Sequence, residues 1–270
     1  MIIAKKIVVK GIVQGVGFRP FIYKNATKNN LKGFVNNTSK GVFIEVEGYE
    51  EDITSFIEEI KHKPPVLSKV TDIKIIDKEI EGYTNFKIIE SKEEEEAITL
   101  ISPDIAICDD CLRDIRDKNN RRYRYAFTNC TNCGPRFSIT KKVPYDRENT
   151  TMDVFQMCSE CREEYNDPLN RRFHAQPNGC SKCGPRVYIC NKEGNEIISN
   201  DPIKDIAKEI KNGKIVAIKG IGGFHLACDA KNKEVINELR KRKKRPRKPL
   251  AVMMRGIETV KKYCDVNELE

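Results

Sequence analysis

The sequence predicts a multidomain α+β protein with three parts. Up to residue 91, strand and helix patterns follow the order β-α-β-β-α-β, which is typical of a ferredoxin-like domain. Regular periodicity then fades where cysteine pairs repeat, and strand and helix patterns return from about Pro202. We therefore expect a ferredoxin-like domain over 1–91, a small cysteine-rich domain over 100–195 and the start of an α/β domain over 200–270.

The first domain contains clear patterns for strands and helices. Alternating apolar residues indicate the strands, and an apolar stripe of Ile53, Phe56, Ile57 and Ile60 indicates the second helix. The expected elements are a strand over 2–13, a helix from Arg19 to Asn30, two strands around a turn at Thr38–Gly41, a helix from Asp52 to His62, and strands near 70–77 and 84–90. The acidic run SKEEEE at 91–96 is typical of a solvated linker.

A glycine-rich turn, GIVQGVGFRP, lies at 11–20 between the first strand and the first helix. Glycine lets backbone N–H groups point inward, and the helix start adds unpaired N–H groups and a positive dipole end. Arg19 stands where its guanidinium could bind phosphate oxygens, although a tight turn with a surface arginine is the simpler alternative. The expected anion-binding loop consists of Gln14, Gly15, Val16, Gly17 and Phe18.

A carboxamide at the end of the second strand, in GFVNN at 33–37, is a second polar group for this site. Together, GIVQGVGFRPF and GFVNNTSKGV resemble the acylphosphatase family over residues 1–91. In that family the loop and its arginine bind the phosphate, and an asparagine holds the attacking water. The resemblance implies these catalytic roles for Arg19 and Asn37, with Asn36 as a variable neighbour. Phosphoryl transfer needs positioning and charge stabilisation more than a covalent nucleophile, so these groups would suffice.

Two cysteine-rich blocks form an internal duplication, offset by fifty residues. Each block holds two C-x2-C pairs with eighteen residues between them, which is the spacing of a four-cysteine zinc site. Eight thiolates therefore predict two closed, structural zinc ions that supply folding energy to a segment with little core. Redox dithiols or an iron–sulfur cluster are alternatives. The expected ligands are Cys108, Cys111, Cys130, Cys133, Cys158, Cys161, Cys180 and Cys183, and pairing within each repeat is the simpler arrangement.

Four residues of or near the duplication have no assigned role. Cys190, Cys228 and Cys264 lie outside the pattern and are expected to be ordinary buried or half-buried thiols. His174 stands at the position that Arg124 holds in the first repeat. It is either a packing histidine or a polar contact to a ligand at a domain interface.

The third part predicts a helix at 201–213, a buried strand, a glycine turn and more extended chain at 214–230, a helix ended by Pro246, and a short strand at 249–254. The basic run RKRKKRPRK at 240–248 stands after the extended chain of 214–230 and before the short strand. This part resembles the start of the YrdC-like fold, which binds ATP and makes acyl or carbamoyl adenylates. The resemblance assigns nucleotide-phosphate binding to Lys243, Arg245 and Lys248.

In this order, the three parts resemble the HypF family, the carbamoyltransferases of [NiFe]-hydrogenase maturation. The resemblance implies that the first domain hydrolyses carbamoyl phosphate and that the carbamate is then adenylated with ATP. A further domain would transfer the carbamoyl group to a cysteine of the partner protein HypE, as a precursor of cyanide ligands. This sequence stops at Glu270, early in the YrdC-like part, so we expect a fragment or one piece of a split system. Hydrolysis and zinc binding should survive without the rest.

Two other classes of function stay open. The net charge of +9 favours anionic partners, and tandem zinc sites with a basic helix could form a nucleic-acid module. The cysteine-rich segment lacks interleaved aromatic residues for base stacking, which makes nucleic acid unlikely. The second class is an interaction scaffold with a non-catalytic first domain. Neither a secretory leader nor an apolar run long enough for a membrane span is visible, so we expect a cytoplasmic protein without membrane association.

Overall fold

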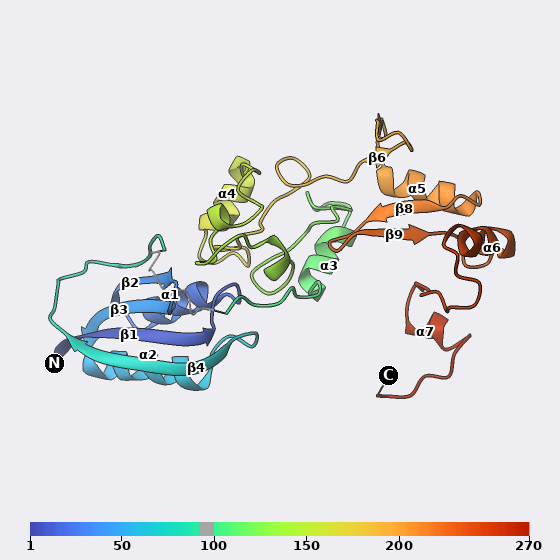
Figure 1. Ribbon diagram of the computed structural model, residues 1–270. Coiled ribbons are helices and arrows are strands. Elements are labelled where there is room, and N and C mark those ends of the chain that lie inside the picture. The colour runs from blue at the N-terminus through green and yellow to red at the C-terminus, as the bar shows by residue number, and fades with distance from the viewer. Residues whose placement is uncertain (92–99, 270) are drawn as a thin grey trace. The chain divides into compact units, whose positions relative to one another are not determined.

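The computed structural model describes residues 1–91 and 100–269 (Figure 1). It divides into two compact units, Met1–Arg186 and Val187–Glu270. The first unit contains the ferredoxin-like domain and nearly all of the cysteine-rich segment, so the three domain ranges stay a prediction. Most of the predicted linker at 91–96 lies outside the described residues. No helix in the described part of the chain combines the length and the apolar character of a membrane span.

The first domain is a five-stranded sheet with two helices. Its elements are β1 Ile2–Ile12, α1 Phe18–Lys28, β2 Lys32–Thr38, β3 Gly41–Tyr49, α2 Glu50–His62, β4 Lys69–Lys78 and β5 Phe86–Ile88. The strand order is β4-β1-β3-β2-β5, and only β5 pairs in parallel, with β2. The predicted β-α-β-β-α-β order is therefore correct but complete at Lys78, and β5 is an additional short edge strand.

The core of this domain lies between the sheet and the two helices. Apolar side chains of β1, β2 and β3 form one buried cluster with Ile22 and Ala26 of α1 and with Phe56 and Ile60 of α2. The alternating burial along β1 and the apolar stripe of α2 explain why these residues form a strand and an amphipathic helix. The register places Asn37 opposite Val42 beside the β2–β3 turn, near the end of β1.

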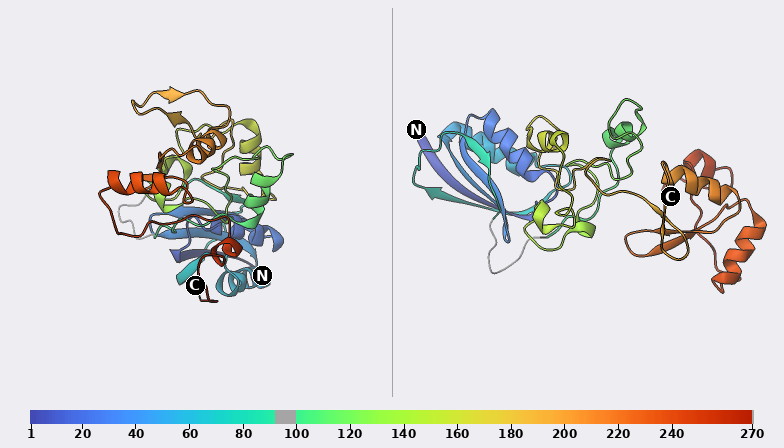
Figure 2. Two further views of the ribbon diagram at one scale, coloured as in Figure 1. Left: turned by 90° about the vertical axis from the view of Figure 1, so that its right-hand side faces the viewer. Right: turned by 90° about the horizontal axis from the view of Figure 1, so that it is seen from above.

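Short helices and turns make up the cysteine-rich segment, which we call the finger module and define as residues 100–186 (Figure 2). Helices α3 Asp109–Arg116 and α4 Ser159–Asn166 each begin directly after the first cysteine of a repeat. Two 3-10 turns, Phe137–Ile139 and Arg147–Asn149, lie between them. The scarcity of regular elements agrees with the sequence, because a segment this rich in Gly, Pro and polar residues builds little core.

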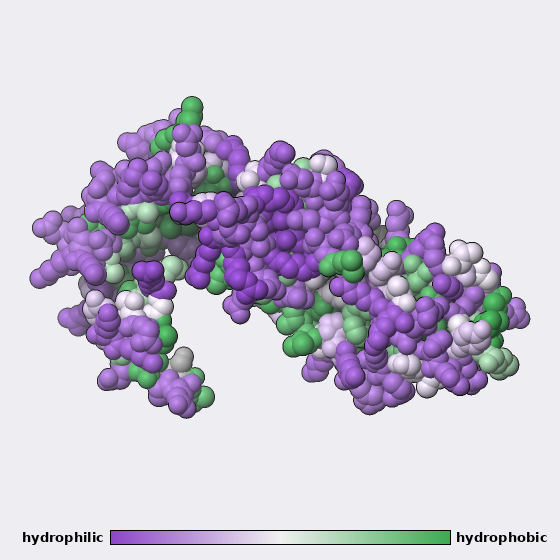
Figure 3. Space-filling view, turned by 180° about the vertical axis from the view of Figure 1, so that it is seen from behind, coloured by the Kyte–Doolittle hydropathy of each residue, from purple (hydrophilic) through white to green (hydrophobic). Residues whose placement is uncertain are grey.

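The second unit contains β6 Ile189–Cys190, β7 Glu196–Ile197, α5 Pro202–Lys211, β8 Val216–Lys219, β9 Phe224–Ala227, α6 Lys233–Arg242 and α7 Ile257–Val260. Leu239 is its only buried residue in the described range. Figure 3 shows that hydrophilic residues cover most of the visible face of the molecule.

Three expectations for the second unit are wrong. The strand at 249–254 does not form, because this segment pairs with neither strand of the β8–β9 hairpin. Strand β8 is largely exposed and not buried, since its sheet has only two strands. Helix α6 ends at Arg242 and not at Pro246, because Lys244 adopts a left-handed conformation with φ of 50°.

Candidate active site and candidate metal centres

The glycine loop joins β1 to α1 through two left-handed residues. Gly15 and Gly17 have φ values of 74° and 75°, a conformation that glycine adopts without steric cost. Gly17 is also the N-cap of α1, and no side chain caps this helix. The unpaired N–H groups of the first turn therefore lie beside the loop, as an anion site requires.

The side chains of Arg19 and Asn37 converge on one atom. Arg19 Nη2 and Asn37 Nδ2 both donate to the carbonyl oxygen of Tyr145, at 3.2 and 3.3 Å. Both residues are buried, with 7% and 1% of their surface exposed. The Asn37 Oδ1 atom has no hydrogen-bond partner among the described residues, which leaves an acceptor free for a water molecule. The structure thus brings the two predicted catalytic residues together, while their catalytic roles stay a prediction.

The group that faces Arg19 comes from the finger module, which the sequence did not lead us to expect. Asp146 Oδ1 lies 2.7 Å from Arg19 Nη2. Gln14 fixes the same segment, because its Oε1 accepts from the Tyr145 amide at 2.8 Å. The Gln14 Nε2 group donates to the Thr38 and Gly41 carbonyls and so joins the loop to the β2–β3 turn. A carboxylate on Arg19 shows that this position accepts an anionic oxygen.

A small cavity of about 20 Å³, enough for one water molecule, lies between the loop and the finger module. From the first domain it is lined by Val13, Gln14, Gly15, Gly17, Phe18, Arg19, Pro20 and Asn37. From the finger module it is lined by Thr131, Arg136, Tyr145, His174, Ala175 and Gln176. The candidate site is therefore composite, and Val16 lies outside this lining.

Arg136 clamps the glycine loop to the first cysteine cluster. Its Nε donates to the carbonyl of Gly15, and its Nη2 donates to the carbonyls of Cys130 and Thr131 at 3.1 and 2.9 Å. Only 2% of this arginine is exposed. Our sequence reasoning missed Arg136, although the repeated CGPR motif, with Arg186 in the second repeat, was a signal for it.

His174 faces the cavity from the second repeat. Its backbone is left-handed, with φ of 52°, and its amide donates to the Tyr165 carbonyl at 2.9 Å. Its ring contacts the rings of Tyr165 and Phe173, with centroids 4.9 and 4.7 Å apart. Burial, together with the positive charge of Arg19, lowers the pKa of His174 to about 3, so the imidazole is neutral at ordinary pH.

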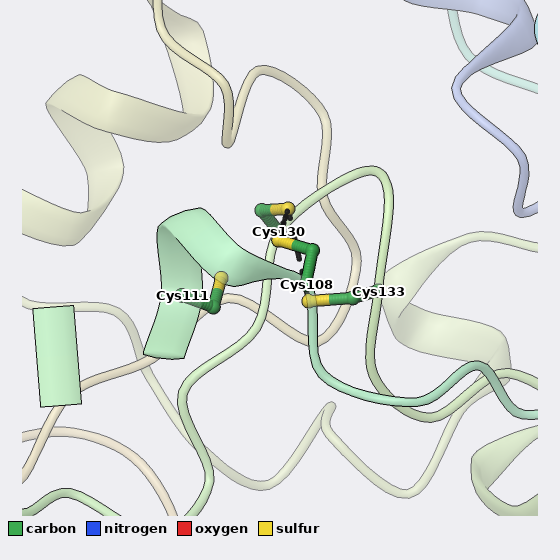
Figure 4. Close-up of side chains that lie close together, drawn as sticks. All are labelled: Cys108, Cys111, Cys130 and Cys133. Atoms are coloured by element: carbon green, nitrogen blue, oxygen red, sulfur yellow. Dashed lines mark hydrogen bonds between the residues drawn. The ribbon is translucent and has the colours of Figure 1, made fainter. Parts of the chain in front are cut away.

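The eight predicted cysteines form two clusters, each within one repeat. In each cluster the four Sγ atoms lie within 4.8 Å of one another, and Figure 4 shows Cys108, Cys111, Cys130 and Cys133 converging. Sulfur–sulfur distances include 3.7 Å for Cys108–Cys130 and 3.8 Å for Cys158–Cys180. A tetrahedral zinc site with Zn–S bonds of about 2.3 Å has sulfur–sulfur edges of about 3.8 Å. Both clusters therefore fit zinc, and the simpler, within-repeat pairing is correct.

Arginines of each repeat contact the cysteine cluster of the other repeat. Arg171 Nη1 lies 2.9 Å from Cys111 Sγ, and Arg121 Nη2 lies 3.3 Å from Cys161 Sγ. Glu164 connects to this network: burial would raise its pKa, but hydrogen bonds from Arg122 and Arg121 lower it to about 2. Asp114 is the equivalent residue in the first repeat and pairs with Arg172 and Arg171. The guanidinium groups offset the negative charge that four thiolates bring to each cluster.

The remaining predicted site residues lie in or near the second unit. Lys243, Arg245 and Lys248 are exposed in the segment that follows α6, where Arg240 Nη1 donates to the carbonyls of Arg245 and Lys248 at 3.2 and 2.9 Å. Their role in nucleotide binding stays a prediction. The burial expected for the three extra cysteines is wrong for Cys190 and Cys264, because the small hairpins and turns of this unit leave them exposed.

Comparisons with known proteins agree with this organisation. Residues 5–88 match the acylphosphatase family, 107–140 and 157–190 match the HypF finger, and 208–270 match the Sua5/YciO/YrdC family, described as telomere recombination. A probable carbamoyltransferase HypF of Methanocaldococcus jannaschii is 54% identical over 98% of this chain and 35% of its own length. An acylphosphatase of Bacillus licheniformis is 45% identical over 31% of this chain and 93% of its own length.

Solved structures give the same result. A full-length HypF in a phosphate- and nucleotide-bound form is 54% identical, with a TM-score of 0.91, over all of this chain and 35% of that one. The fold and the site thus define an acylphosphatase domain joined to two tetracysteine fingers and a partial YrdC segment. The chain belongs to the HypF family of carbamoyltransferases and corresponds to the N-terminal part of its members. It spans about a third of the length of these relatives.

Proposed function

We propose that the acylphosphatase domain of this chain hydrolyses carbamoyl phosphate. The convergence of Arg19 and Asn37 beside the uncapped start of α1 is the observation that carries the proposal. An acyl phosphate is a dianion, and the loop amides with a guanidinium match its oxygens. The names of the relatives point to the carbamoyl group as the acyl part.

The reaction follows from these positions. The loop from Gln14 to Phe18 and the Arg19 guanidinium bind the phosphate oxygens and stabilise the charge that develops on them. The Asn37 carboxamide orients a water molecule through its free Oδ1. The water oxygen forms a bond to phosphorus, the bond from phosphorus to the carbamoyl oxygen breaks, and the electron pair leaves with carbamate. The proton of the water goes to the phosphate product or to solvent.

The two cysteine clusters hold structural zinc in this proposal. All four positions of each ion are taken by thiolates, so the ions supply folding energy and no open coordination site. Cysteines that ligate zinc and form no disulfide in the described structure suit a reducing compartment, and we place the protein in the cytoplasm.

The wider role is that of the first part of a carbamoyltransferase for [NiFe]-hydrogenase maturation. Carbamate from the first domain is adenylated with ATP in the YrdC-like part, with Lys243, Arg245 and Lys248 on the nucleotide phosphates. The carbamoyl group then reaches a cysteine of HypE. This chain spans about a third of its relatives, so the proposal assigns adenylation and transfer to the complete family enzyme.

Phosphate release from carbamoyl phosphate by the full chain tests the hydrolysis. We expect Arg19→Ala and Asn37→Ala each to lower kcat/KM by about 100-fold, the usual effect of losing one transition-state donor. Arg113→Ala is the matched control, because Arg113 is an exposed arginine of α3 whose partner is Asp110. A folded, zinc-loaded wild type without turnover, or equal rates in all three variants, would contradict the proposal.

A further inference from the structure

The two sides of the candidate pocket carry different chemistry. The side formed by the first domain supplies the loop, Arg19 and Asn37, which the proposed reaction uses for the phosphate and the attacking water. The side formed by the finger module supplies His174 and Gln176 among its polar groups. A substrate whose phosphate and water are bound by the first domain leaves its acyl end for the finger module.

Of His174 and Gln176, only His174 has free hydrogen-bonding capacity in its side chain. Its ring nitrogens form no hydrogen bond with any residue in the described part of the chain. Gln176 uses both ends of its amide, since Nε2 donates to the His174 carbonyl at 3.0 Å and Oε1 accepts from the Tyr165 hydroxyl at 3.1 Å. Gln176 and Tyr165 therefore hold His174 in place. The imidazole and the buried Tyr145 hydroxyl are left without a partner among the described residues, and of these two the imidazole offers both a donor and a free lone pair on an unprotonated nitrogen.

The backbone of His174 indicates that its position is imposed by the fold. A left-handed conformation is uncommon for a residue with a side chain and persists where the surroundings enforce it. Two contacts enforce it here: the hydrogen bond from the His174 amide to the Tyr165 carbonyl, and the packing of the imidazole against the rings of Tyr165 and Phe173. Arg124, the equivalent residue of the first repeat, shares the conformation with φ of 59° but does not line the pocket.

We propose that His174 is a specificity-determining residue that recognises the carbamoyl end of the substrate; this inference rests on the proposed hydrolysis. A neutral imidazole offers one N–H donor and one lone-pair acceptor. A carbamoyl group presents an NH2 donor that an acetyl group lacks, whereas the carbonyl acceptor is common to both. The imidazole lone pair, which accepts from the NH2 group, is therefore the atom that discriminates. An uncharged group also adds no repulsion beside Arg19, which must stay free for the phosphate. The substrate dianion displaces the Asp146 carboxylate from Arg19, and this exchange makes room in the pocket.

Comparison of carbamoyl phosphate with acetyl phosphate tests the proposal, since the two differ by NH2 against CH3. We expect this chain to favour carbamoyl phosphate. His174→Ala should lower kcat/KM for carbamoyl phosphate by about tenfold, the value of one hydrogen bond, and leave acetyl phosphate within about twofold. His174→Phe keeps the ring contacts with Tyr165 and Phe173 and should give the same loss. Arg124→Ala is the matched control and should keep the wild-type ratio.

Each other outcome overturns the inference in a distinct way. If His174→Phe is folded and keeps the wild-type substrate ratio, or if both substrates lose activity equally, His174 does not read the acyl end and the proposed hydrolysis still stands. If the wild type, with its zinc bound, hydrolyses neither substrate, the inference falls together with the proposed function.

Discussion

Arg19 lies among residues that come from two parts of the chain. Its guanidinium lies beside Asn37 of the sheet and contacts Tyr145 and Asp146 of the finger module. A buried charge without a partner is costly, so the Arg19 guanidinium needs an anionic group beside it, either Asp146 or another anion. In the proposed reaction, the substrate phosphate takes the place of the Asp146 carboxylate on Arg19.

At the residue scale, acid should destabilise the protein through His174. The pKa of His174 is about 3 in the folded state, against an ordinary value of 6.5 in the unfolded chain. Between these pH values the unfolded chain binds a proton that the folded protein does not. The contribution of the neutral His174 to the free energy of unfolding is therefore present above pH 6.5 and is lost progressively as the pH drops towards 3. From pH 7.5 to 5.5 we expect a loss of about 1 kcal/mol in the wild type. Denaturant unfolding at constant zinc content measures it, and an equal loss in His174→Phe would contradict this origin.

The glycines of the loop give a second prediction at this scale. A Cβ at Gly15 would meet Arg136 Cδ at 3.0 Å, and Arg136 is held by several carbonyls and cannot easily withdraw. At Gly17 the nearest atom is Thr131 Cβ at 3.7 Å. Both positions have left-handed backbones, so both alanine variants lose about 1–3 kcal/mol from strain.

We expect Gly15→Ala to unfold at a lower denaturant concentration than Gly17→Ala, because only the former also disturbs the clamp to the first cysteine cluster. Denaturant unfolding of the two variants measures the difference. Identical midpoints would show that Arg136 yields without cost.

At the scale of elements, the two repeats support each other. The arginines that follow α3 contact the second cysteine cluster, and those that follow α4 contact the first. Thr131 adds a further contact between the repeats, since its amide and hydroxyl donate to the Arg171 carbonyl at 3.2 and 3.0 Å. Neither finger is complete without groups from its duplicate, which explains why the two repeats pack as one module.

The cross-repeat contacts predict where a substitution is felt. Arg171→Gln lies in the second repeat but should weaken zinc binding at the first cluster by about 10- to 100-fold, as losses of outer hydrogen bonds to metal ligands do. Zinc transfer to a chromogenic chelator measures the affinity. Mass-spectrometric mapping of alkylated cysteines then identifies the opened cluster.

For this experiment Arg113→Gln is the control, because Arg113 lies on α3 next to the first cluster but pairs only with Asp110 in the described structure. Preferential alkylation of Cys158, Cys161, Cys180 and Cys183 in the Arg171 variant would refute the claim that Arg171 of the second repeat stabilises the first cluster.

At the scale of the whole molecule, the finger module is part of the proposed active site. Arg136 and His174 face the pocket beside the glycine loop, and Arg136 also donates to the Cys133 and Cys130 carbonyls of the first cysteine cluster. In the proposed function, zinc bound at the clusters would influence acyl-phosphate hydrolysis through these residues without contacting the substrate.

Zinc removal should therefore unfold the fingers and also lower the activity of the proposed site. After chelation we expect carbamoyl phosphate hydrolysis by the full chain to fall by at least about tenfold, because the loss of the finger wall removes at least one hydrogen bond to the substrate. Stoichiometric zinc should restore the rate, and magnesium should not. An apo protein with unfolded fingers and full activity would show that the first domain needs no second wall.

Much of this organisation could be read from short stretches of sequence. The glycine-rich turn predicts the anion loop, the proline after Arg19 marks a first helical turn, and the C-x2-C spacing predicts the ligand sets. Each of these signals is local, because backbone freedom, helix capping and chelation by nearby thiols depend on residues a few positions apart.

Contacts between distant residues carried no such signal. The Arg19–Tyr145 hydrogen bond joins residues 126 positions apart, and the Arg171–Cys111 contact joins residues 60 apart. No periodicity or motif encodes which of several arginines meets which carbonyl or sulfur, since that choice depends on how the finger module packs against the loop. The sequence therefore predicts the anion loop and the metal ligands, whereas the second wall of the pocket and the exchange between repeats emerge when the chain packs in three dimensions.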